Sequence, residues 1–392
     1  MSKALIVGCG IVGCTVARIL ADRGWTVRIV DRRDHIGGNL YDYRDEHGIL
    51  VQQYGPHIFH TNSERVFEFV NRYSRWNKFN LVCGAVIDGI CTPTAFNLKT
   101  IDLFFDKAKA EEIKQHIRER FPGRESATVV ELLDCDDAVI RDYAQFLFDK
   151  DYSLYTAKQW GISPSEIDKS VLKRVPIRFT YEEAYFKDKY QVMPENGYTS
   201  FIRNLIDHPA ISVTLNYEAM EHITIRDNAV YLDGKKADYP VVYTGPLDEL
   251  FHYEYGRLPY RSLRFEWIYR DAESYQDLPV VAYPQAEKFT RITEYKKLPV
   301  QDVRGTTCAV EYPVPYEADA DTSVEPYYPV LTEASKKAYS TYADAAAKVS
   351  GLYCAGRLAD FRYYNMDQAP ADASNKEHTH DGYVAGIRAF IR

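Results

Sequence analysis

The stretch Gly8-Cys9-Gly10-Ile11-Val12-Gly13 determines how this chain begins to fold. It follows the apolar residues 4–7 and precedes apolar residues at helical spacing over 12–20, and the β-favouring segment 26–30 comes next. A glycine turn between a strand and a helix lets the backbone approach a pyrophosphate, and the helix N-terminus offers N–H donors. Asp31 follows at the spacing of a carboxylate that accepts from a ribose hydroxyl. The pattern predicts a dinucleotide-binding Rossmann-like unit in an α/β chain.

A second glycine pair indicates which dinucleotide is bound. Gly37 and Gly38 lie within the segment 33–39, just after the acidic residue. Flavoproteins of the glutathione-reductase and amine-oxidase type show such a pair where the backbone passes close to the cofactor. We therefore expect FAD rather than a free nicotinamide nucleotide. The predicted cofactor-binding residues of this region are Gly8, Gly10, Gly13, Asp31, Arg33, Gly38 and Asn39.

Composition limits the class of protein. The 392 residues carry a formal net charge of −8, which gives no support to a general nucleic-acid or anionic-membrane surface. The seven cysteines are scattered without a CxxC pair or Cys/His ligand spacing, so we expect no metal site and a reducing, cytoplasmic location. No apolar run approaches the roughly 20 residues of a membrane span, and we expect no membrane insertion.

The periodicity along the chain predicts three interwoven lobes. Residues 107–120 favour a helix, Asp88-Gly89 is a hairpin signal, and aromatic and β-branched residues alternate with polar ones over 260–312. We expect an FAD-binding Rossmann-like domain, a small helical lobe and an antiparallel β-sheet domain. The expected bounds are 1–79, 212–246 and 346–392 for the first, 98–165 for the second, and 80–97, 166–211 and 247–345 for the third.

Longer strings along the chain resemble one family. They are Tyr54-Gly-Pro-His-Ile-Phe-His-Thr61, Tyr155-Thr-Ala-Lys-Gln-Trp-Gly161, Met193-Pro194, Gly245-Pro-Leu-Asp248, Thr290-Arg-Ile-Thr-Glu294, Tyr327-Tyr-Pro329 and Gly356-Arg-Leu358. Together, and in this order, they resemble the bacterial UDP-galactopyranose mutases over essentially the whole chain. The resemblance implies a three-lobed flavoenzyme with its active site in the cleft between the lobes, and a homodimer. It also implies that the antiparallel sheet is twisted and that the helical lobe carries a mobile substrate loop.

The resemblance also implies an activity. The family interconverts UDP-galactopyranose and UDP-galactofuranose without net oxidation. In the family, N5 of the reduced flavin attacks the anomeric carbon, UDP departs, and a flavin-sugar iminium allows the ring to open and reclose. The flavin must be reduced, so an electron donor such as NAD(P)H or a reductase is implied as a partner. Furanose sugars of such pathways typically enter cell-surface polysaccharide.

Individual site residues follow from the same resemblance. Arg174 and Arg291 match the two catalytic arginines, whose planar guanidinium groups suit a diphosphate because they bond phosphate oxygens bidentately. The further residues implied for the substrate are Tyr155, which stacks on uracil in the family, Trp160, Tyr185, Tyr328, Tyr363 and Asn80. Those implied beside the flavin are His57, His60, Arg357, Met366 and Asp367, with His60 also counted as catalytic.

Three departures from the family pattern bear on the substrate. Asp151 stands where relatives often have phenylalanine, Ala282 where they often have asparagine, and Asn365 where they commonly have aspartate. Asp151 either points to solvent or recognises a base other than uracil. These departures leave open the same chemistry on another nucleotide sugar, such as UDP-N-acetylgalactosamine, UDP-arabinopyranose or a deoxysugar nucleotide.

The cofactor domain alone is compatible with two function classes that lack mutase activity. One is a flavin-dependent oxidase or desaturase, and the other is a non-catalytic flavoprotein that senses redox state or nucleotide sugars. The paired arginines, Arg174 and Arg291, together with the tyrosine set, argue against both.

Overall fold

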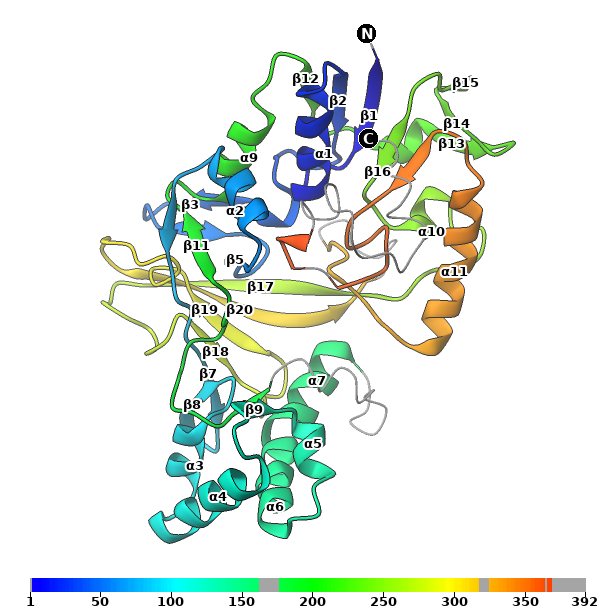
Figure 1. Cartoon of the computed structure of the whole chain (residues 1–392). Coiled ribbons are helices and arrows are strands. Elements are labelled where there is room, and N and C mark those ends of the chain that lie inside the picture. The colour runs from blue at the N-terminus through cyan, green and yellow to red at the C-terminus, as the bar shows by residue number, and fades with distance from the viewer. Residues whose placement is uncertain (1, 162–175, 317–323, 364, 369–392) are drawn as a thin grey trace.

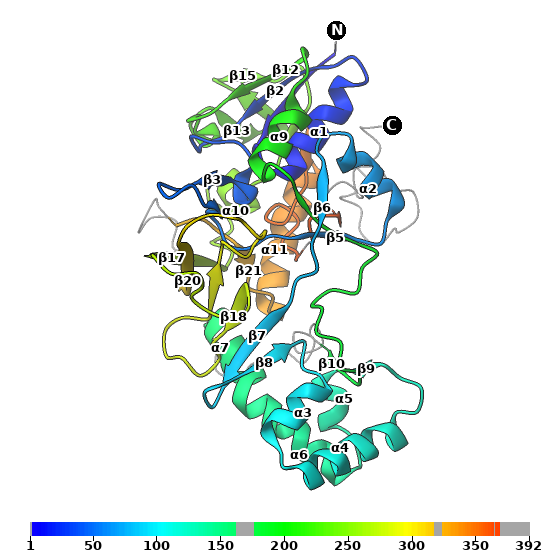
Figure 2. The same ribbon diagram turned by 90° about the vertical axis from the view of Figure 1, so that its left-hand side faces the viewer.

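The computed structural model describes residues 2–161, 176–316, 324–363 and 365–368. A parallel sheet with its helices lies at one end of the molecule and a helical lobe at the other, with a long antiparallel sheet between them (Figures 1 and 2). Arg174 and most of the expected domain segment 346–392 lie outside the described residues.

The parallel sheet is the predicted nucleotide-binding unit. Its five strands run in the order β12-β2-β1-β16-β22, and every neighbouring pair is parallel. The strands are β1 (Lys3–Val7), β2 (Thr26–Val30), β12 (Ile211–Thr214), β16 (Val241–Tyr243) and β22 (Leu352–Cys354). Helix α1 (Ile11–Ala21) forms the crossover between β1 and β2 and packs on the sheet with Val16, Ala17 and Leu20. The Rossmann-like βαβ prediction is confirmed, with boundaries that agree within about two residues.

Other segments complete this end of the molecule. They are the pair β3 (Asp42–Arg44) and β4 (Leu50–Gln52), the sheet of β5 (Phe59–Thr61), β11 (Tyr190–Pro194) and β6 (Trp76–Lys78), and helices α2 (Glu64–Asn71) and α9 (Tyr198–Ile206). Helix α9 packs against α1, and its first N–H groups, those of Tyr198 and Thr199, donate to the buried Asp42 carboxylate at 2.5 and 2.8 Å. The segment of β11 and α9 therefore packs with the nucleotide-binding unit, whereas the sequence-based division placed 166–211 in the sheet domain.

The antiparallel sheet has seven strands in the order β21-β17-β20-β19-β18-β7-β8, and its one parallel pair is β18 with β7. The strands are β7 (Cys83–Ile87), β8 (Ile90–Thr94), β17 (Tyr260–Arg270), β18 (Val280–Ala282), β19 (Arg291–Glu294), β20 (Thr306–Pro315) and β21 (Tyr328–Pro329). Asp88 and Gly89 join β7 to β8 with φ of 48° and 82°, the left-handed backbone of a two-residue hairpin turn. The hairpin prediction at these residues is confirmed.

The helical lobe packs beneath the far edge of this sheet (Figure 1). Its elements are α3 (Leu98–Phe104), α4 (Lys107–Arg120), α5 (Val129–Leu133), α6 (Ala138–Leu147), the π-helical turn η2 (Phe148–Tyr152), α7 (Ser153–Trp160) and the strand pair β9 (Ser126–Ala127) and β10 (Ile177–Arg178). Side chains of Asn97, Asp106, Thr128 and Asp137 accept from the first-turn N–H groups of α3 to α6, which explains where these helices begin.

The remaining elements flank the parallel sheet. They are β13 (Ile223–Arg226), β14 (Ala229–Leu232), β15 (Lys235–Lys236), the short turns η1 (Gly38–Leu40) and η4 (Ala219–Glu221), and helices α10 (Leu247–Leu250) and α11 (Glu333–Ala347). Tyr342 and Ala346 of α11 lie in the same apolar cluster as Val241 and Cys354 of the parallel sheet. Helix α11 thus packs on the nucleotide-binding unit, although the sequence-based division placed it with 247–345.

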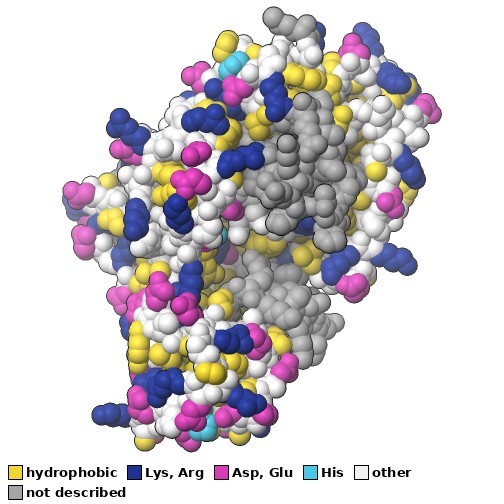
Figure 3. Space-filling view, in the orientation of Figure 1, with side chains coloured by type: hydrophobic (Ala, Val, Ile, Leu, Met, Phe, Trp, Pro, Cys, Tyr) yellow, Lys and Arg dark blue, Asp and Glu magenta, His cyan; other side chains and the backbone are white. Residues whose placement is uncertain are grey.

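The surface carries charges of both signs. On the face shown in Figure 3, Lys and Arg side chains alternate with Asp and Glu over the part of the chain that is described. Within the described ranges, no helix is both long enough and apolar enough to cross a bilayer, and no cluster of three or more His, Cys, Asp or Glu side chains could hold a metal ion.

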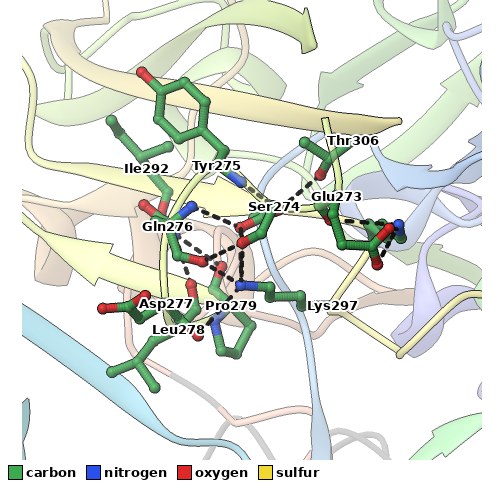
Figure 4. A network of polar contacts seen from close by, with 12 residues as sticks. Glu273, Ser274, Tyr275, Gln276, Asp277, Leu278, Pro279, Ile292, Lys297 and Thr306 are labelled. Carbon is green, nitrogen blue, oxygen red and sulfur yellow. Dashed lines mark hydrogen bonds and ion pairs between the residues drawn. The ribbon is translucent and has the colours of Figure 1, made fainter. Parts of the chain in front are cut away.

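A network of polar contacts, in which Lys297 and Thr306 take part, holds the loop before β18 (Figure 4). Glu294, with no exposed surface, accepts hydrogen bonds from the backbone N–H groups of Tyr275 and Gln276 at 2.9 and 3.0 Å and from the Thr306 hydroxyl at 2.8 Å. Lys297 adds an ion pair at 3.3 Å. Glu294 therefore fixes the loop at 273–279 by satisfying donors that would otherwise be buried without partners.

Replacing Glu294 with alanine should lower the free energy of unfolding by about 3 kcal/mol, because two backbone donors and one hydroxyl lose their buried acceptor. Urea unfolding followed by far-UV circular dichroism measures the change. Glu273→Ala is the matched control: this side chain of the same loop is 93% exposed, and its partner Lys296, which is 10% exposed, keeps the Glu273 carbonyl as an acceptor at 3.3 Å. Its removal should therefore shift the unfolding midpoint much less than the removal of Glu294. Equal midpoint shifts in the two variants would contradict the role given to Glu294.

Candidate active site

A cavity opens where the carboxyl ends of the parallel strands meet the loop at 54–57 and the segment at 356–366. This edge of an open α/β sheet is where the ligands of such folds bind. Of the residues predicted to bind the cofactor, those lining the cavity are Gly8, Gly10, Gly13, Asp31, Arg33, Gly38, Asn39, His57, Arg357 and Met366. Ten side chains or glycines from distant parts of the sequence thus converge on one cavity.

Glycines are required at the turn for steric reasons. A Cβ on Gly13 would lie 2.0 Å from the Gly8 carbonyl oxygen, and a Cβ on Gly8 would lie 1.9 Å from the Thr244 hydroxyl. A Cβ on Gly38 would approach the Gly10 Cα to 3.0 Å. By contrast, a Cβ on Gly10 would meet no atom of the described chain within 4 Å, so that Gly10 faces open space at the start of α1. This open space is a cradle for a group that approaches the backbone closely.

Asp31 and Arg33 are held by the turn but keep polar groups available. Asp31 accepts the N–H of Cys9 at 2.6 Å and that of Arg33 at 2.9 Å. The Arg33 guanidinium pairs with Glu325 at 3.2 Å and donates to Asn39 at 2.9 Å. Its Nη1 is buried at the cavity wall without a hydrogen-bond partner among the described residues. A buried donor without a partner is costly, and a pyrophosphate or ribose oxygen would satisfy it.

His57 supplies a neutral imidazole to the cavity wall. Its Nδ1 lies 2.8 Å from the Gly55 carbonyl oxygen, so Nδ1 carries the proton and Nε2 is an acceptor. Burial, together with the positive charges of Arg357 and Arg291, lowers the pKa of His57 to about 4, although the hydrogen bond to the Gly55 carbonyl opposes this shift. The ring therefore stays neutral at physiological pH. A Cβ on Gly55 would lie 3.6 Å from the Oε2 of Glu311, the carboxylate that pairs with Arg291, so the predicted substrate arginine is close to the loop that carries His57.

Arg291 is the centre of the predicted substrate cluster. Burial raises the pKa of Tyr155 and of Tyr328, and the positive charge of Arg291 opposes both shifts. Tyr185 and Tyr363 add to the rise in the pKa of Tyr155 by charge, so these tyrosines share one electrostatic environment. The rings of Tyr328 and Tyr363 are stacked with centroids 5.1 Å apart, and the Arg357 guanidinium lies 5.6 and 5.4 Å from them.

The Arg291 side chain is itself fixed by a carboxylate. Its Nε and Nη2 both lie 2.7 Å from the Glu311 Oε2, and the Glu311 side chain is 3% exposed. Burial by itself lowers the pKa of Arg291, but Glu311 raises it well above its ordinary value. Arg291 is thus a permanently charged group in a sparsely hydrated place.

Other predicted residues lie apart from the cavity lining. His60 stacks on Phe186 with its Nδ1 2.9 Å from Asp188, and Asp367 accepts from the Thr61 hydroxyl at 2.9 Å. Asn80 is exposed in the link between β6 and β7. Trp160 ends α7, and Arg174 lies outside the described residues.

Asp151 does not point to solvent. It is 9% exposed within η2, and burial raises its pKa to about 7, although Lys158 counteracts this in part. Lys158 donates to the carbonyls of Tyr283 and Phe289, each at 2.9 Å, and so joins α7 to the turn between β18 and β19. The carboxylate is therefore a buried group near Tyr155, and one of the two sequence-based explanations for it is excluded.

Two residues of this region were missed in the sequence. Glu311 gave one signal, because it is the lone charged residue of the otherwise uncharged strand β20. Arg261 of β17 lies opposite Tyr328 in register and donates from Nε to the Gln159 carbonyl at 3.2 Å. Its guanidinium lies under Gly161, where an added Cβ would be 2.7 Å away. Nothing in the sequence around Arg261 indicates that this strand residue contacts the end of α7, about 100 residues before it in the chain.

The glycine turn, the acidic residue after β2, the unpartnered Arg33 Nη1 and the convergent lining are those of an FAD-binding flavoprotein with a Rossmann-like domain. Arg291 lies close to this cavity, because the carboxylate that pairs with it is covered by Gly55 of the loop that carries His57.

Comparisons with known proteins assign the family. The model of the UDP-galactopyranose mutase family matches residues 150–363, and that of the NAD(P)-binding Rossmann-like domain matches 6–73. The "Probable UDP-galactopyranose mutase" of Klebsiella pneumoniae is 37% identical over 94% of this chain and 92% of its own length. The dTDP-fucopyranose mutase of Escherichia coli is 34% identical over 94% and 95%, and the UDP-galactopyranose mutase of Mycoplasma pneumoniae 33% over 95% and 94%. The chain belongs to the UDP-galactopyranose mutase family.

Solved structures share the fold. A crystal structure of reduced UDP-galactopyranose mutase superposes with a TM-score of 0.68 at 14% identity, over 100% of this chain and 96% of that chain. An oxidoreductase from Methanosarcina mazei superposes with a TM-score of 0.57 at 12% identity, over 99% and 100%. The predicted α/β flavoprotein architecture and family are both confirmed.

The open space at Gly10 leads us to expect that a side chain there weakens FAD binding. Gly10→Ala should leave the thermal stability of the flavin-free protein unchanged but weaken FAD binding by about 10-fold or more, because the methyl group takes the place of a close-lying pyrophosphate. Flavin fluorescence titration measures the affinity. Gly13→Ala is the contrasting variant: its Cβ collides with the Gly8 carbonyl, so this variant should lose stability even without flavin. Wild-type FAD affinity in Gly10→Ala would contradict the placement.

The lowered pKa of His57 predicts how the stability of the protein depends on pH. The unfolded chain binds the histidine proton at its ordinary pKa of 6.5, whereas the folded protein binds it only near pH 4. The stability that neutral His57 contributes is therefore complete above pH 6.5 and is lost as the pH falls from 6.5 to 4, by about 3 kcal/mol. His57→Asn keeps a donor for the Gly55 carbonyl but does not titrate. Urea unfolding at several pH values should show the wild type losing this extra stability relative to His57→Asn, and parallel pH profiles would refute the assignment.

Proposed function

We propose that this chain catalyses the reversible conversion of UDP-galactopyranose to UDP-galactofuranose on reduced FAD, without net oxidation. The observation that carries the proposal is Arg291, held by its ion pair with Glu311 beneath the loop that brings His57 into the cofactor cavity. The cavity residue Arg357 lies over the stacked rings of Tyr328 and Tyr363. A diphosphate needs such a fixed cationic fork, and a tyrosine-lined wall offers hydroxyl donors and stacking surfaces for a nucleotide. The 37% identical relative from Klebsiella pneumoniae supports the choice of sugar.

In this proposal, different residues bind the diphosphate and the base of the substrate. Arg291 binds the diphosphate, with Tyr185, Tyr328 and Tyr363 as hydroxyl donors, and Arg174 is the second predicted arginine. Tyr155 is the predicted stacking surface for the base. Bound and reduced, FAD would supply the nucleophile for the anomeric carbon, so the protein has to hold the diphosphate next to the cofactor cavity while the sugar changes ring size. Cationic groups on the leaving diphosphate also stabilise the charge that develops there.

His57 contributes an uncharged acceptor beside the cofactor. Because Nδ1 is occupied by the Gly55 carbonyl, Nε2 of His57 can accept a hydrogen bond from a group in the cavity. The predicted cofactor residues Asp31, Arg33 and Asn39 would hold the ribose and pyrophosphate, and Met366 and Arg357 would lie against the remainder of the cofactor.

Three further properties belong to the same proposal. The electron donor is NAD(P)H or a reductase, since the FAD has to be reduced before each series of turnovers. The protein acts as a homodimer. It works in the cytoplasm, which the seven free cysteines support, since none of them forms a disulfide.

A deoxysugar nucleotide is the second candidate substrate. The 34% identical relative from Escherichia coli is a dTDP-fucopyranose mutase. Ala282 pairs directly with Arg291 across β18 and β19, and a methyl group there leaves room next to the guanidinium. Buried Asp151 adds an acceptor near Tyr155 that could receive the N–H of a base. These two residues favour testing both nucleotides.

Anaerobic incubation of the dithionite-reduced protein tests the proposal. UDP-galactofuranose should be converted to UDP-galactopyranose, with no conversion by the oxidised protein and no dithionite consumed per turnover, as chromatography of the nucleotide sugars will show. Arg291→Ala should retain FAD but lose about 100-fold or more of the activity. Conversion of dTDP-fucopyranose alone would move the assignment to the second candidate. Absence of either conversion, with flavin bound and reducible, would refute the proposed function.

A further inference from the structure

Five neighbouring strands of the antiparallel sheet place one row of directly paired side chains on the same face, and Arg291 belongs to this row. Phe265 of β17 pairs with Glu311 of β20, and Glu311 pairs with Arg291 of β19. Arg291 pairs with Ala282 of β18, and Ala282 with Ala85 of β7. Directly paired residues project from the same face of a sheet, so this row places Arg291 between one carboxylate and two alanines.

The carboxylate occupies one edge of the guanidinium. Nε and Nη2 of Arg291 each approach the Glu311 Oε2 to 2.7 Å. No hydrogen bond to another described residue engages Nη1. The Arg291 side chain is 23% exposed, against 3% for Glu311. Nε and Nη2 are thus already bonded to the carboxylate, and Nη1 is the guanidinium nitrogen left to meet a ligand.

Glu311 is itself enclosed by groups that leave it little freedom. The Thr290 hydroxyl lies 3.2 Å from the Glu311 carbonyl oxygen and 3.4 Å from its Oε1. A Cβ on Gly55 would be 3.4 Å from the Phe265 ring and 3.6 Å from Oε2, so the loop that carries His57 lies directly over the carboxylate. The acceptor is thus fixed by the sheet below, by Thr290 at its side and by the cofactor loop above.

Fixing an arginine in advance has a physical benefit. A free arginine side chain loses rotamer entropy when a ligand immobilises it, and burying a guanidinium without a counter-charge destabilises the protein. An arginine that is already immobilised and paired binds a diphosphate without these two costs. Its remaining N–H groups also point in one fixed direction before the ligand arrives.

We propose that Glu311 is a positioning residue, which holds Nε and Nη2 of Arg291 so that the Nη1 side faces the diphosphate of the substrate. The inference rests on the proposed function, in which Arg291 binds that diphosphate. Glu311 acts through Arg291 and does not touch the substrate. The carboxylate opposes a diphosphate by charge, so its contribution to binding is geometric and has the opposite sign to its Coulomb effect.

Binding of UDP to the FAD-loaded protein tests the proposal, because UDP carries the diphosphate but no sugar. Isothermal titration is made on the wild type, Glu311→Ala, Glu311→Gln, Arg291→Ala and the double variant Arg291→Ala/Glu311→Ala. Glu311→Ala should weaken UDP binding by about 10-fold or more. Glu311→Gln should stay within about threefold of the wild type, because its amide oxygen still accepts from Nε and Nη2. The double variant should match Arg291→Ala, since a positioning residue has no effect without the group it positions.

The controls separate this role from general damage. Glu266→Ala removes another carboxylate of the same sheet, which bonds Tyr312 on the exposed side, and should leave UDP affinity unchanged. Flavin absorbance and thermal melting of each variant monitor cofactor content and folding, and Glu311→Gln preserves shape if Glu311→Ala folds poorly.

Each contrary outcome overturns the proposal in a recognisable way. Unchanged or tighter UDP binding by Glu311→Ala would mean that the carboxylate acts only by charge. The same loss in the presence and absence of Arg291 would show a general structural role, and a loss confined to the sugar nucleotide would show direct contact with the sugar. If the wild type itself binds neither UDP nor dTDP, the proposed function fails and the inference fails with it.

Discussion

The structure depends on one close approach of the backbone, where the start of α1 passes over the end of β1. Gly13 lies so near the Gly8 carbonyl that a Cβ would stand 2.0 Å from it, and this contact fixes the angle at which the helix leaves the sheet. The same contact leaves Gly10 facing open space at the helix N-terminus. The same glycine turn therefore determines two features: the anion-binding site at the N-terminus of α1 and the path of the crossover from β1 to β2.

The antiparallel sheet then has to bring a second binding region to the same cavity. It does so through β19 and β20, whose register places Arg291 opposite Glu311, and through the loop at 54–57, which carries His57 into the cavity and covers Glu311 with Gly55. The link between the two regions is therefore steric, since a side chain at position 55 would press on Phe265 and Glu311. Glu294 performs a structural task in the same motif, three residues after Arg291, by holding the loop before β18.

The sequence is informative where chemistry and conformation are local. The βαβ unit, the Asp88-Gly89 hairpin and the glycine cradle were all predictable, because a glycine turn or a left-handed pair constrains its own neighbours. The resemblance assigned Arg291 and the tyrosines, although most of these site assignments stay predictions. Glu311 and Arg261 could not be located in this way, because their partners come from strand register and from a helix about 100 residues distant. The division into domains met the same difficulty: α9 and α11 pack on the parallel sheet through contacts that no local periodicity reveals.

Burial affects the charge of the two ionisable side chains His57 and Arg291 differently, because only Arg291 has a carboxylate partner. Burial removes the charge of His57, which has no anion beside it and two arginines nearby, whereas Arg291 keeps its charge because Glu311 compensates it. The cofactor side of the site thus presents a neutral acceptor, and the diphosphate side presents a fixed cation. A site built in this way can hold an anion firmly on one side without adding charge next to the ring system on the other. That separation suits a reaction in which the diphosphate leaves and returns while the cofactor stays in place.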